Sequence, residues 1–258
     1  YMLSKFLSVK LLRLPKRKMT TVHDLTTKFQ KLSLKNTHHN GNESQQHGFV
    51  WEKQIGAVLG ASDEEMNSIS YTSNIDLPSC FNRKHGVDNH CKTTGSQTVC
   101  MGSVVNTFDH LDSDKTHLTV IHYTQNEHWK IVENVYQLDL TGMRTEFFGD
   151  ITYEEILNLE SIIKRIPPGR LNKSERERIY NKMKRELESK SGLMKLNPKV
   201  DSKSQRRLQC SFNIKIFMEK YPGMCIYSGD GNKFYDGYIS PKIESRRRRL
   251  KRRKDIQS

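Results

Sequence analysis

The sequence predicts an α/β or α+β fold, in which a mixed β-sheet is flanked by helices. Residues 117–124 and 129–140 are rich in β-branched and aromatic side chains and are separated by four polar residues, so we expect a β-hairpin there. Segments with helical periodicity precede and follow this hairpin. Helices and strands interspersed in this way are typical of a mixed sheet covered by helices.

The amino-terminal segment is expected to lie outside the folded domain. Residues 1–18 carry six basic side chains and no acidic one, which is similar to a transit peptide, although a translation start at Met19 is the interpretation that we favour. Residues 33–47 are rich in Asn, His and Ser and are typical of a linker. We therefore expect residues 1–40 to be a basic extension that is disordered or partly helical.

The first half of the domain is predicted to contain two helices and two strands besides the hairpin. Residues 48–60 place apolar side chains on one helical face and are expected to form a helix. Residues 69–77 and 86–93 are expected to be short strands joined by a polar loop, and residues 102–111 a short helix.

Two capping boxes predict the helices of the second half. Thr152 with Glu155 opens a helix that ends before the Pro-Pro-Gly at 167–169. Ser174 with Glu177 is expected to open the next helix. This second helix is expected to bury one stripe of side chains: Ile179, Met183 and Leu187.

The remainder of the chain is predicted to contain one strand. Residues 192–207 are basic and expected to be irregular. Residues 210–217 alternate between apolar and polar side chains and are expected to form a strand, whereas residues 222–236 are expected to be rich in turns.

Charge is unevenly distributed along this chain, whose formal net charge is +14. Residues 164–215 carry 16 basic and five acidic side chains, whereas residues 19–163 carry 10 basic and 19 acidic ones. An acidic half beside a basic half suits a cation-binding site beside a surface that binds a polyanion. Residues 246–258 begin with a basic run and are expected to be a disordered tail, which would raise nonspecific DNA affinity or act as a nuclear-localisation-like signal.

Cysteine content and hydropathy restrict the location of the protein. The five cysteines include no CxxC pair, which argues against a disulfide framework or a zinc site and suits a reducing, intracellular compartment. No run of 18 apolar residues occurs, so we expect no membrane-spanning helix. Organellar targeting by residues 1–18 is the less favoured alternative to a cytoplasmic or nuclear location.

An acid and a lysine on the two expected short strands are candidate catalytic residues. Asp76 lies at the end of the first strand and Lys92 near the end of the second. Hydrolysis of a phosphodiester needs a nucleophilic water and neutralisation of charge on the phosphate, which a metal ion held by carboxylates and a lysine provide. Mg²⁺ prefers oxygen ligands and retains several waters, so one or two carboxylates suffice.

The order of a helix glutamate (Glu52), an aspartate beside a proline (Asp76) and a strand lysine (Lys92) resembles the PD-(D/E)xK nuclease superfamily. The resemblance covers about residues 45–215 and extends to restriction-endonuclease-like proteins encoded by large DNA viruses of algae and amoebae. It includes the segments GFVWEKQI, NIDLPS, CKTTGS and NPKVDSKSQRRLQCS. It implies a restriction-endonuclease-like core and Mg²⁺-dependent, type II restriction-like cleavage of double-stranded DNA. It further implies that Asp76 and Glu52 bind the metal and that Lys92 contacts the phosphate.

The sequence departs from the superfamily pattern at His90, which stands where the motif has Asp or Glu, two residues before Lys92. Three outcomes are open. Glu52 supplies the second carboxylate from its helix, which we favour; Asp88, on the same strand face, supplies it; or His90 weakens or abolishes activity. A second D-x-K at residues 201–203 ranks lower, because no strand is expected around it.

The predicted DNA-contacting residues lie in the basic half of the chain. Arginine can pair with guanine and glutamine with adenine in the major groove, whereas phosphate contacts alone carry no sequence information. The candidates are Lys199, Lys203, Gln205, Arg206, Arg207 and Gln209. We therefore expect a nuclease-like domain at 41–245, with a catalytic part at about 45–150 and a DNA-binding part at about 151–217.

Two alternatives to an active nuclease are compatible with the sequence. A catalytically silent nucleic-acid-binding protein with the same fold would account for His90 and the basic segments. A basic structural or organellar protein would account for the amino-terminal segment. A homodimer is a further expectation if the recognised DNA sequence is palindromic.

Overall fold

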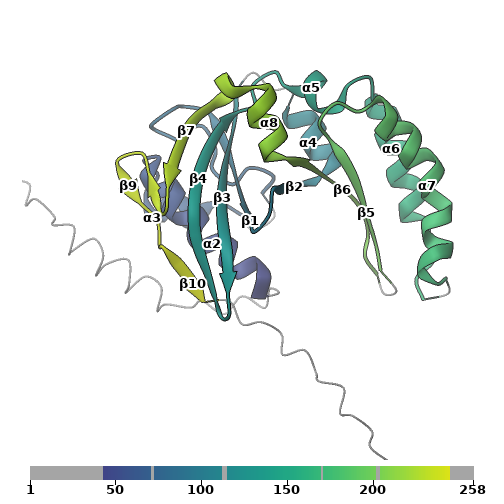
Figure 1. The fold of residues 1–258 in the computed structure, drawn as a ribbon, viewed down its shortest axis with the longest axis horizontal. Coiled ribbons are helices and arrows are strands. Elements are labelled where there is room, and N and C mark those ends of the chain that lie inside the picture. The colour runs from purple at the N-terminus through teal and green to yellow at the C-terminus, as the bar shows by residue number, and fades with distance from the viewer. Residues whose placement is uncertain (1–42, 71–72, 112–114, 170, 202–203, 245–258) are drawn as a thin grey trace, which may run out of the picture. The chain divides into compact units, whose positions relative to one another are not determined.

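The computed structural model of this protein is described here for residues 43–70, 73–111, 115–169, 171–201 and 204–244 (Figure 1). The predicted extension at 1–40, the tail at 246–258 and Lys203 lie outside the described residues. None of the helices in the described ranges is long and apolar enough to cross a membrane.

A five-stranded mixed sheet carries the site. β1 pairs with β3 in parallel, β3 pairs with β4 in antiparallel, and both β7 and β10 pair with β4 in antiparallel. The strands are β1 (Asp88–Thr94), β3 (Thr116–Asn126), β4 (Trp129–Asp139), β7 (Cys225–Asp230) and β10 (Lys242–Glu244). The predicted mixed α/β class is confirmed, and the predicted hairpin is β3–β4.

A second, antiparallel sheet continues the chain directly from β1. Its order is β2 (Thr98–Ser103), β6 (Arg206–Asn213) and β5 (Lys195–Val200). The Oγ1 atom of Thr94 donates to the carbonyl of Thr98 at 2.7 Å, which tightens the turn between the two sheets. β8 (Lys233–Phe234) and β9 (Gly237–Tyr238) form a separate small hairpin.

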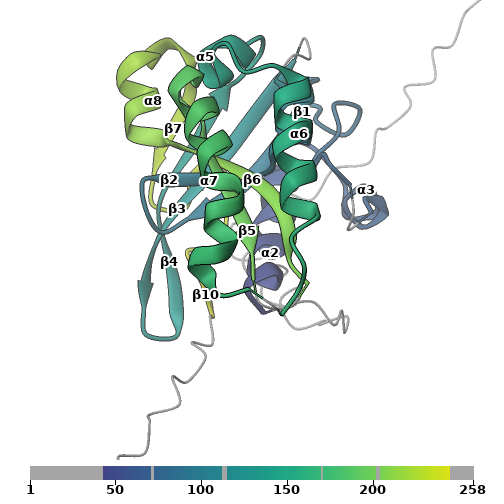
Figure 2. The same ribbon diagram turned by 90° about the vertical axis from the view of Figure 1, so that its right-hand side faces the viewer.

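Helices cover both faces of the central sheet. The helices within the described residues are α2 (Glu43–Val58), α3 (Asp63–Ser68), α4 (Val104–His110), α5 (Arg144–Phe148), α6 (Tyr153–Lys164), α7 (Lys173–Lys190) and α8 (Ile214–Lys220), with a 3₁₀ turn at Pro222–Met224. Trp51 and Ile55 of α2 pack with Ile121 and Val135 on one face of the sheet. On the other face, Leu118 and its neighbours pack with α4, α6 and the second sheet. Figure 2 shows α6 and α7 lying over β5 and β6.

The helices predicted at 48–60, at 102–111 and after Thr152 are confirmed. α6 has the predicted capping box, in which the Thr152 hydroxyl and the Glu155 carboxylate each bond the other's backbone N–H. α7 begins earlier than predicted, because its capping box is Asn172 with Glu175 and not Ser174 with Glu177. The predicted buried stripe is wrong at Ile179, whose exposed fraction is 46%, whereas Tyr180 and Leu187 are the buried residues of α7.

The strand predicted at 69–77 is wrong. Of its described residues only Leu77 pairs, through an isolated bridge in which Leu77 and Asn89 exchange two backbone hydrogen bonds of 2.9 Å. Pro78 follows with no N–H to donate, and its carbonyl accepts from Phe81 to begin a turn. The strand predicted at 86–93 is confirmed as β1.

The irregular segment predicted at 192–207 and the strand predicted at 210–217 are wrong in part. Residues 195–200 form β5, where Pro198 is tolerated because β5 is an edge strand. β6 stops at Asn213, whose side-chain oxygen accepts the Ile216 N–H at 3.1 Å and begins α8. The turn-rich segment predicted at 222–236 contains β7, an additional strand of the central sheet.

Candidate active site

Glu52 is positioned by α2. Its neighbours Trp51 and Ile55 are buried, so Glu52 lies at the margin of the buried helix face. The Trp51 Nε1–H donates to the Ser240 carbonyl at 3.0 Å. The Gln54 amide accepts from the Ser240 N–H and donates to its Oγ, each at 2.7 Å. These bonds restrict the rotation of α2 and hence the direction of the Glu52 side chain.

Asp76 lies along the free edge of β1. Its Oδ2 atom accepts the backbone N–H of Cys91 at 2.7 Å and the ammonium of Lys92 at 3.0 Å. The next residue, Leu77, is buried in the core beside Trp51 and bridged to Asn89. An edge strand presents unpaired N–H groups, and the Asp76 carboxylate satisfies one of them.

Lys92 joins Asp76 from β1. One quarter of the Lys92 side chain is exposed to solvent and one fifth of the Asp76 side chain. Burial lowers the pKa of the Lys92 ammonium, but the Asp76 and Glu52 carboxylates outweigh burial and raise the pKa above its ordinary value. Lys92 is therefore a cation at neutral pH.

Glu52 interacts with both of these residues. Burial and the adjacent Asp76 charge raise the pKa of Glu52 to about 7, while Lys92 opposes the rise. One ammonium thus faces two carboxylates, and it does not neutralise both. The structure brings Glu52, Asp76 and Lys92 together from three separate segments, as the sequence predicted.

His90 lies beside the pair but is not a cation. Its Nδ1 atom is 4.0 Å from Asp76 Oδ2, and its ring lies 5.0 Å from the ring of His110 in α4. Burial, followed by the Lys92 charge, lowers the pKa of His90 to about 4. At neutral pH the motif position therefore holds a neutral imidazole in place of a carboxylate.

The Asp88 carboxylate forms a structural hydrogen bond. Its Oδ1 atom accepts the Ser79 N–H at 2.7 Å and closes the turn that follows Pro78. Of the two carboxylates considered for the second ligand position, Glu52 is the one whose charge interacts with Asp76 and Lys92. This favours Glu52 over Asp88.

The residues present fit a hard divalent cation bound largely by water. Within the described part of the chain, no group of three or more His, Cys, Asp and Glu side chains is arranged to hold a metal. Glu52 and Asp76 nevertheless bring two carboxylates and one ammonium to a partly buried place, where burial and the Asp76 charge disfavour ionisation of Glu52 and raise its pKa. Two carboxylates are sufficient for Mg²⁺, which keeps several waters, and insufficient for a dedicated Ca²⁺ cage.

Arg206, predicted to contact DNA, instead holds the protein together. Its Nε and Nη2 atoms donate to the carbonyls of Ile166 and Pro167 at 2.7 and 3.0 Å. Its Nη1 atom donates to the carbonyls of Asp201 and Gln205. Only 10% of the side chain is exposed, so in this structure the guanidinium is not accessible to a DNA base.

The other described candidates are accessible. Lys199, Gln205 and Arg207 are exposed, and Gln209 is partly exposed. Lys199 and Arg207 are opposite one another in the β5–β6 register, so their side chains share one face of the second sheet.

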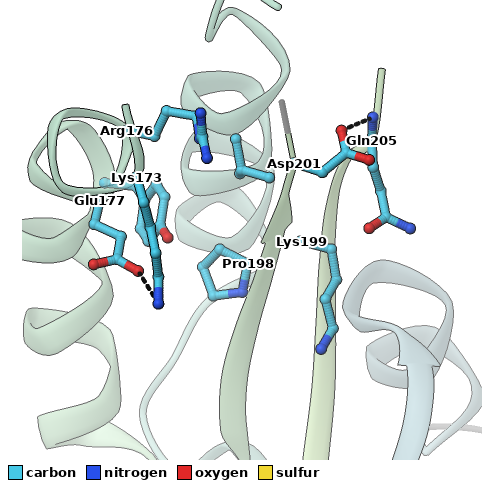
Figure 3. Close-up of a pocket in the computed structure, with 9 residues that line it drawn as sticks. Lys173, Arg176, Glu177, Pro198, Lys199, Asp201 and Gln205 are labelled. Atoms are coloured by element: carbon cyan, nitrogen blue, oxygen red, sulfur yellow. Dashed lines mark hydrogen bonds and ion pairs between the residues drawn. The ribbon is translucent and has the colours of Figure 1, made fainter. Parts of the chain in front are cut away.

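A hollow of about 260 Å³ lies between α7 and the opposite side of β5 (Figure 3). In the figure, the Pro198 ring faces α7, whereas the Lys199 side chain points away from it. Lys173 pairs with Glu177 at 3.7 Å, so part of the basic charge in the hollow is compensated. The hollow is lined by Lys173, Arg176, Glu177, Tyr180, Pro198, Lys199, Val200, Asp201 and Gln205. None of the residues Glu52, Asp76 and Lys92 contributes to it.

Two contacts that support the site have no signal in the sequence. Asn106 of α4 donates to the side chain of Asn74 at 2.6 Å, and His110 packs against His90. Both contacts join segments that are distant in the sequence, and no pattern of neighbouring residues predicts such contacts.

Comparisons with protein-family models, curated proteins and solved structures gave no match for this chain.

Proposed function

We propose that this protein is a Mg²⁺-dependent endonuclease that hydrolyses phosphodiester bonds in double-stranded DNA, as type II restriction enzymes do. The proposal depends on one observation: Glu52, Asp76 and Lys92, from a helix, an edge segment and a strand, interact with one another. The basic composition of residues 164–215 supports a polyanionic substrate.

Each residue has a role that follows from its contacts. Asp76 and Glu52 would hold the cation, which supplies polarisation of the scissile phosphate and acidification of a water molecule. The Lys92 ammonium, which Asp76 orients, would stabilise negative charge that develops on the phosphate. Glu52 loses its proton near pH 7, so the proposed site gains its second negative ligand as pH rises from 6 to 8.

Plasmid cleavage tests the proposal. Wild-type protein should linearise supercoiled plasmid in Mg²⁺ or Mn²⁺ but not in EDTA, and more rapidly at pH 8 than at pH 6. Asp76→Asn and Lys92→Met should each lower the rate at least about 100-fold, since a lost charge-stabilising contact typically costs that much. Glu64→Gln, which changes an exposed acid of α3, is the matched control and should cleave like wild type. Equal cleavage by all four proteins would reject the site.

A catalytically silent DNA-binding protein is the second candidate, and His90 is the observation that favours it. The buried imidazole is neutral at pH 7 and contributes no charge to a metal site. Under this hypothesis wild-type protein binds duplex DNA without cutting it, and His90→Glu gains Mg²⁺-dependent cleavage. His90→Gln controls for loss of the ring, and cleavage by wild type that His90→Glu does not increase would exclude a decayed site.

A further inference from the structure

The β5–β6 pair projects beyond its third strand. β2 pairs with β6 from Thr98, opposite Asn213, to Ser103, opposite Gln209, and the chain then turns into α4. Residues 206–208 and 198–200 continue as an antiparallel pair without a third strand among the described residues. Figure 1 shows β5 and β6 extending past β2. We call this pair, Lys195–Val200 with Arg206–Asn213, the ribbon.

The two faces of the ribbon differ in chemistry. The back contains Leu196 and Leu208, which are buried in the core with α6 and α7. The front carries polar side chains in register, with Lys199 opposite Arg207 and Asn197 opposite Gln209. Within the described part of the chain, neither Lys199 nor Arg207 forms an ion pair. The front therefore offers two unneutralised cations next to two amides.

The ribbon is rigidly attached. Arg206 on the back donates to the carbonyls of Ile166 and Pro167, which follow α6. A binding element works best when its support fixes the side chains that contact the ligand. Adjacent arginines thus have opposite surroundings, because Arg206 is 10% exposed and bonded while Arg207 is exposed.

The ribbon and the proposed catalytic site are connected through α4. Ser103, opposite Gln209, accepts the Asn106 N–H and begins this helix. The Asn106 side chain bonds Asn74, two residues before Asp76. These two hydrogen bonds link the strand next to the ribbon with the segment that carries Asp76.

We propose that the ribbon enters the major groove of duplex DNA and that Arg207 and Gln209 contact base edges, while Lys199 contacts a phosphate. The inference rests on the proposed function, since it assumes a duplex DNA substrate. The major groove of B-DNA admits a two-stranded ribbon, Arg matches the O6 and N7 atoms of guanine, and Gln matches the N6 and N7 atoms of adenine. The deep, narrow major groove of duplex RNA does not admit these side chains.

Selection from a random duplex library tests the inference, with full-length protein in EDTA so that no cleavage occurs. Wild type should enrich one sequence. Arg207→Ala should relax the choice at one base pair and weaken binding to the selected site about 5- to 150-fold, the range of a lost bidentate contact. Lys199→Ala should weaken binding to selected and random duplexes equally.

Two controls separate base contact from charge and from folding. Arg178→Ala removes the same charge from an exposed position of α7 and should leave the selected sequence unchanged. Arg206→Ala should lower the melting temperature, whereas Arg207→Ala should retain it. Equal effects of Arg178→Ala and Arg207→Ala on the selected site would overturn the inference, as would equal binding of duplex RNA. Failure of plasmid cleavage alone would reject the nuclease and leave the ribbon result standing, because binding is measured without cleavage.

Discussion

Glu52 is a carboxylic acid in surroundings that disfavour its charge. Its pKa is about 7 in the folded protein and near 4.5 in the unfolded chain, so the folded state binds the extra proton between these values. The associated stability is fully present below pH 4.5 and is lost as the pH rises through 7. Folding therefore bears an electrostatic penalty at pH 8 that is absent at pH 4.

Glu52→Gln should remove this penalty while keeping the size of the side chain. We expect the free energy of unfolding at pH 8 to increase by about 1 to 3 kcal/mol, because one pKa unit corresponds to about 1.4 kcal/mol and partial solvent access reduces the full value. The gain should shrink towards pH 5. Urea denaturation in EDTA at the two pH values measures it, with Glu64→Gln as control; a stability change that is independent of pH would contradict the raised pKa.

A divalent cation bound by the same carboxylates should stabilise the folded protein. Because a ligand that binds only the folded state stabilises it, Mg²⁺ or Mn²⁺ should raise the melting temperature of wild type at pH 8. The increase should be smaller for Asp76→Asn, which keeps the shape of the side chain but lacks its charge. An equal increase in both proteins would place cation binding elsewhere.

At the scale of single elements, the start of α7 allows a sharp comparison. The Asn172 side chain accepts the Glu175 N–H at 3.0 Å, and the Glu175 carboxylate accepts the Asn172 N–H at 2.7 Å. Asn172→Ala should cost about 1 kcal/mol of unfolding free energy, as expected for loss of a helix cap. Ser174→Ala, at the position that the sequence pattern suggested, should cost less. Thermal denaturation distinguishes the two, and the opposite ranking would return the cap to Ser174.

Elements with a local cause were predictable. The Thr152–Glu155 box, the apolar face of α2 and the β-branched and aromatic residues of β3 and β4 are all encoded within a few residues, and all were confirmed. The elements that were predicted wrongly depend on tertiary contacts or contain residues that are compatible with two local structures. Asn213 can extend a strand or cap a helix, and Pro198 is compatible with a strand only at a sheet edge.

The residues of the candidate site could be proposed from the sequence, but the contacts that hold them in position could not. Asp76 and Lys92 are close because Leu77 bridges Asn89, so the site needs one bridge and not the strand predicted at 69–77. The neutral state of His90 depends on burial and on Lys92, which no spacing along the chain specifies. The inward orientation of Arg206 depends on carbonyls about 40 residues earlier in the chain.

At the scale of the whole molecule, the basic carboxy-terminal segment is expected to contribute to DNA binding that does not depend on sequence. Residues 246–258 begin with eight basic side chains among nine residues. Their removal should weaken binding to random duplexes and reduce the slope of log affinity against log salt concentration, because fewer counterions are released. The sequence enriched from a library should stay the same. Fluorescence anisotropy at several salt concentrations provides the measurement, and an unchanged slope would show that the tail does not contact the phosphates.

The bonds from α2 to Ser240 also constrain when the protein becomes competent during its synthesis. Trp51 and Gln54 emerge from the ribosome before the groups that fix them, which are 186 or more residues later. Until Ser240 has emerged, the nascent chain lacks the contacts that set the direction of Glu52. A nascent chain that contains Asp76 and Lys92 but not Ser240 therefore lacks the contacts that orient Glu52, and the three residues can come together only after Ser240 has been synthesised.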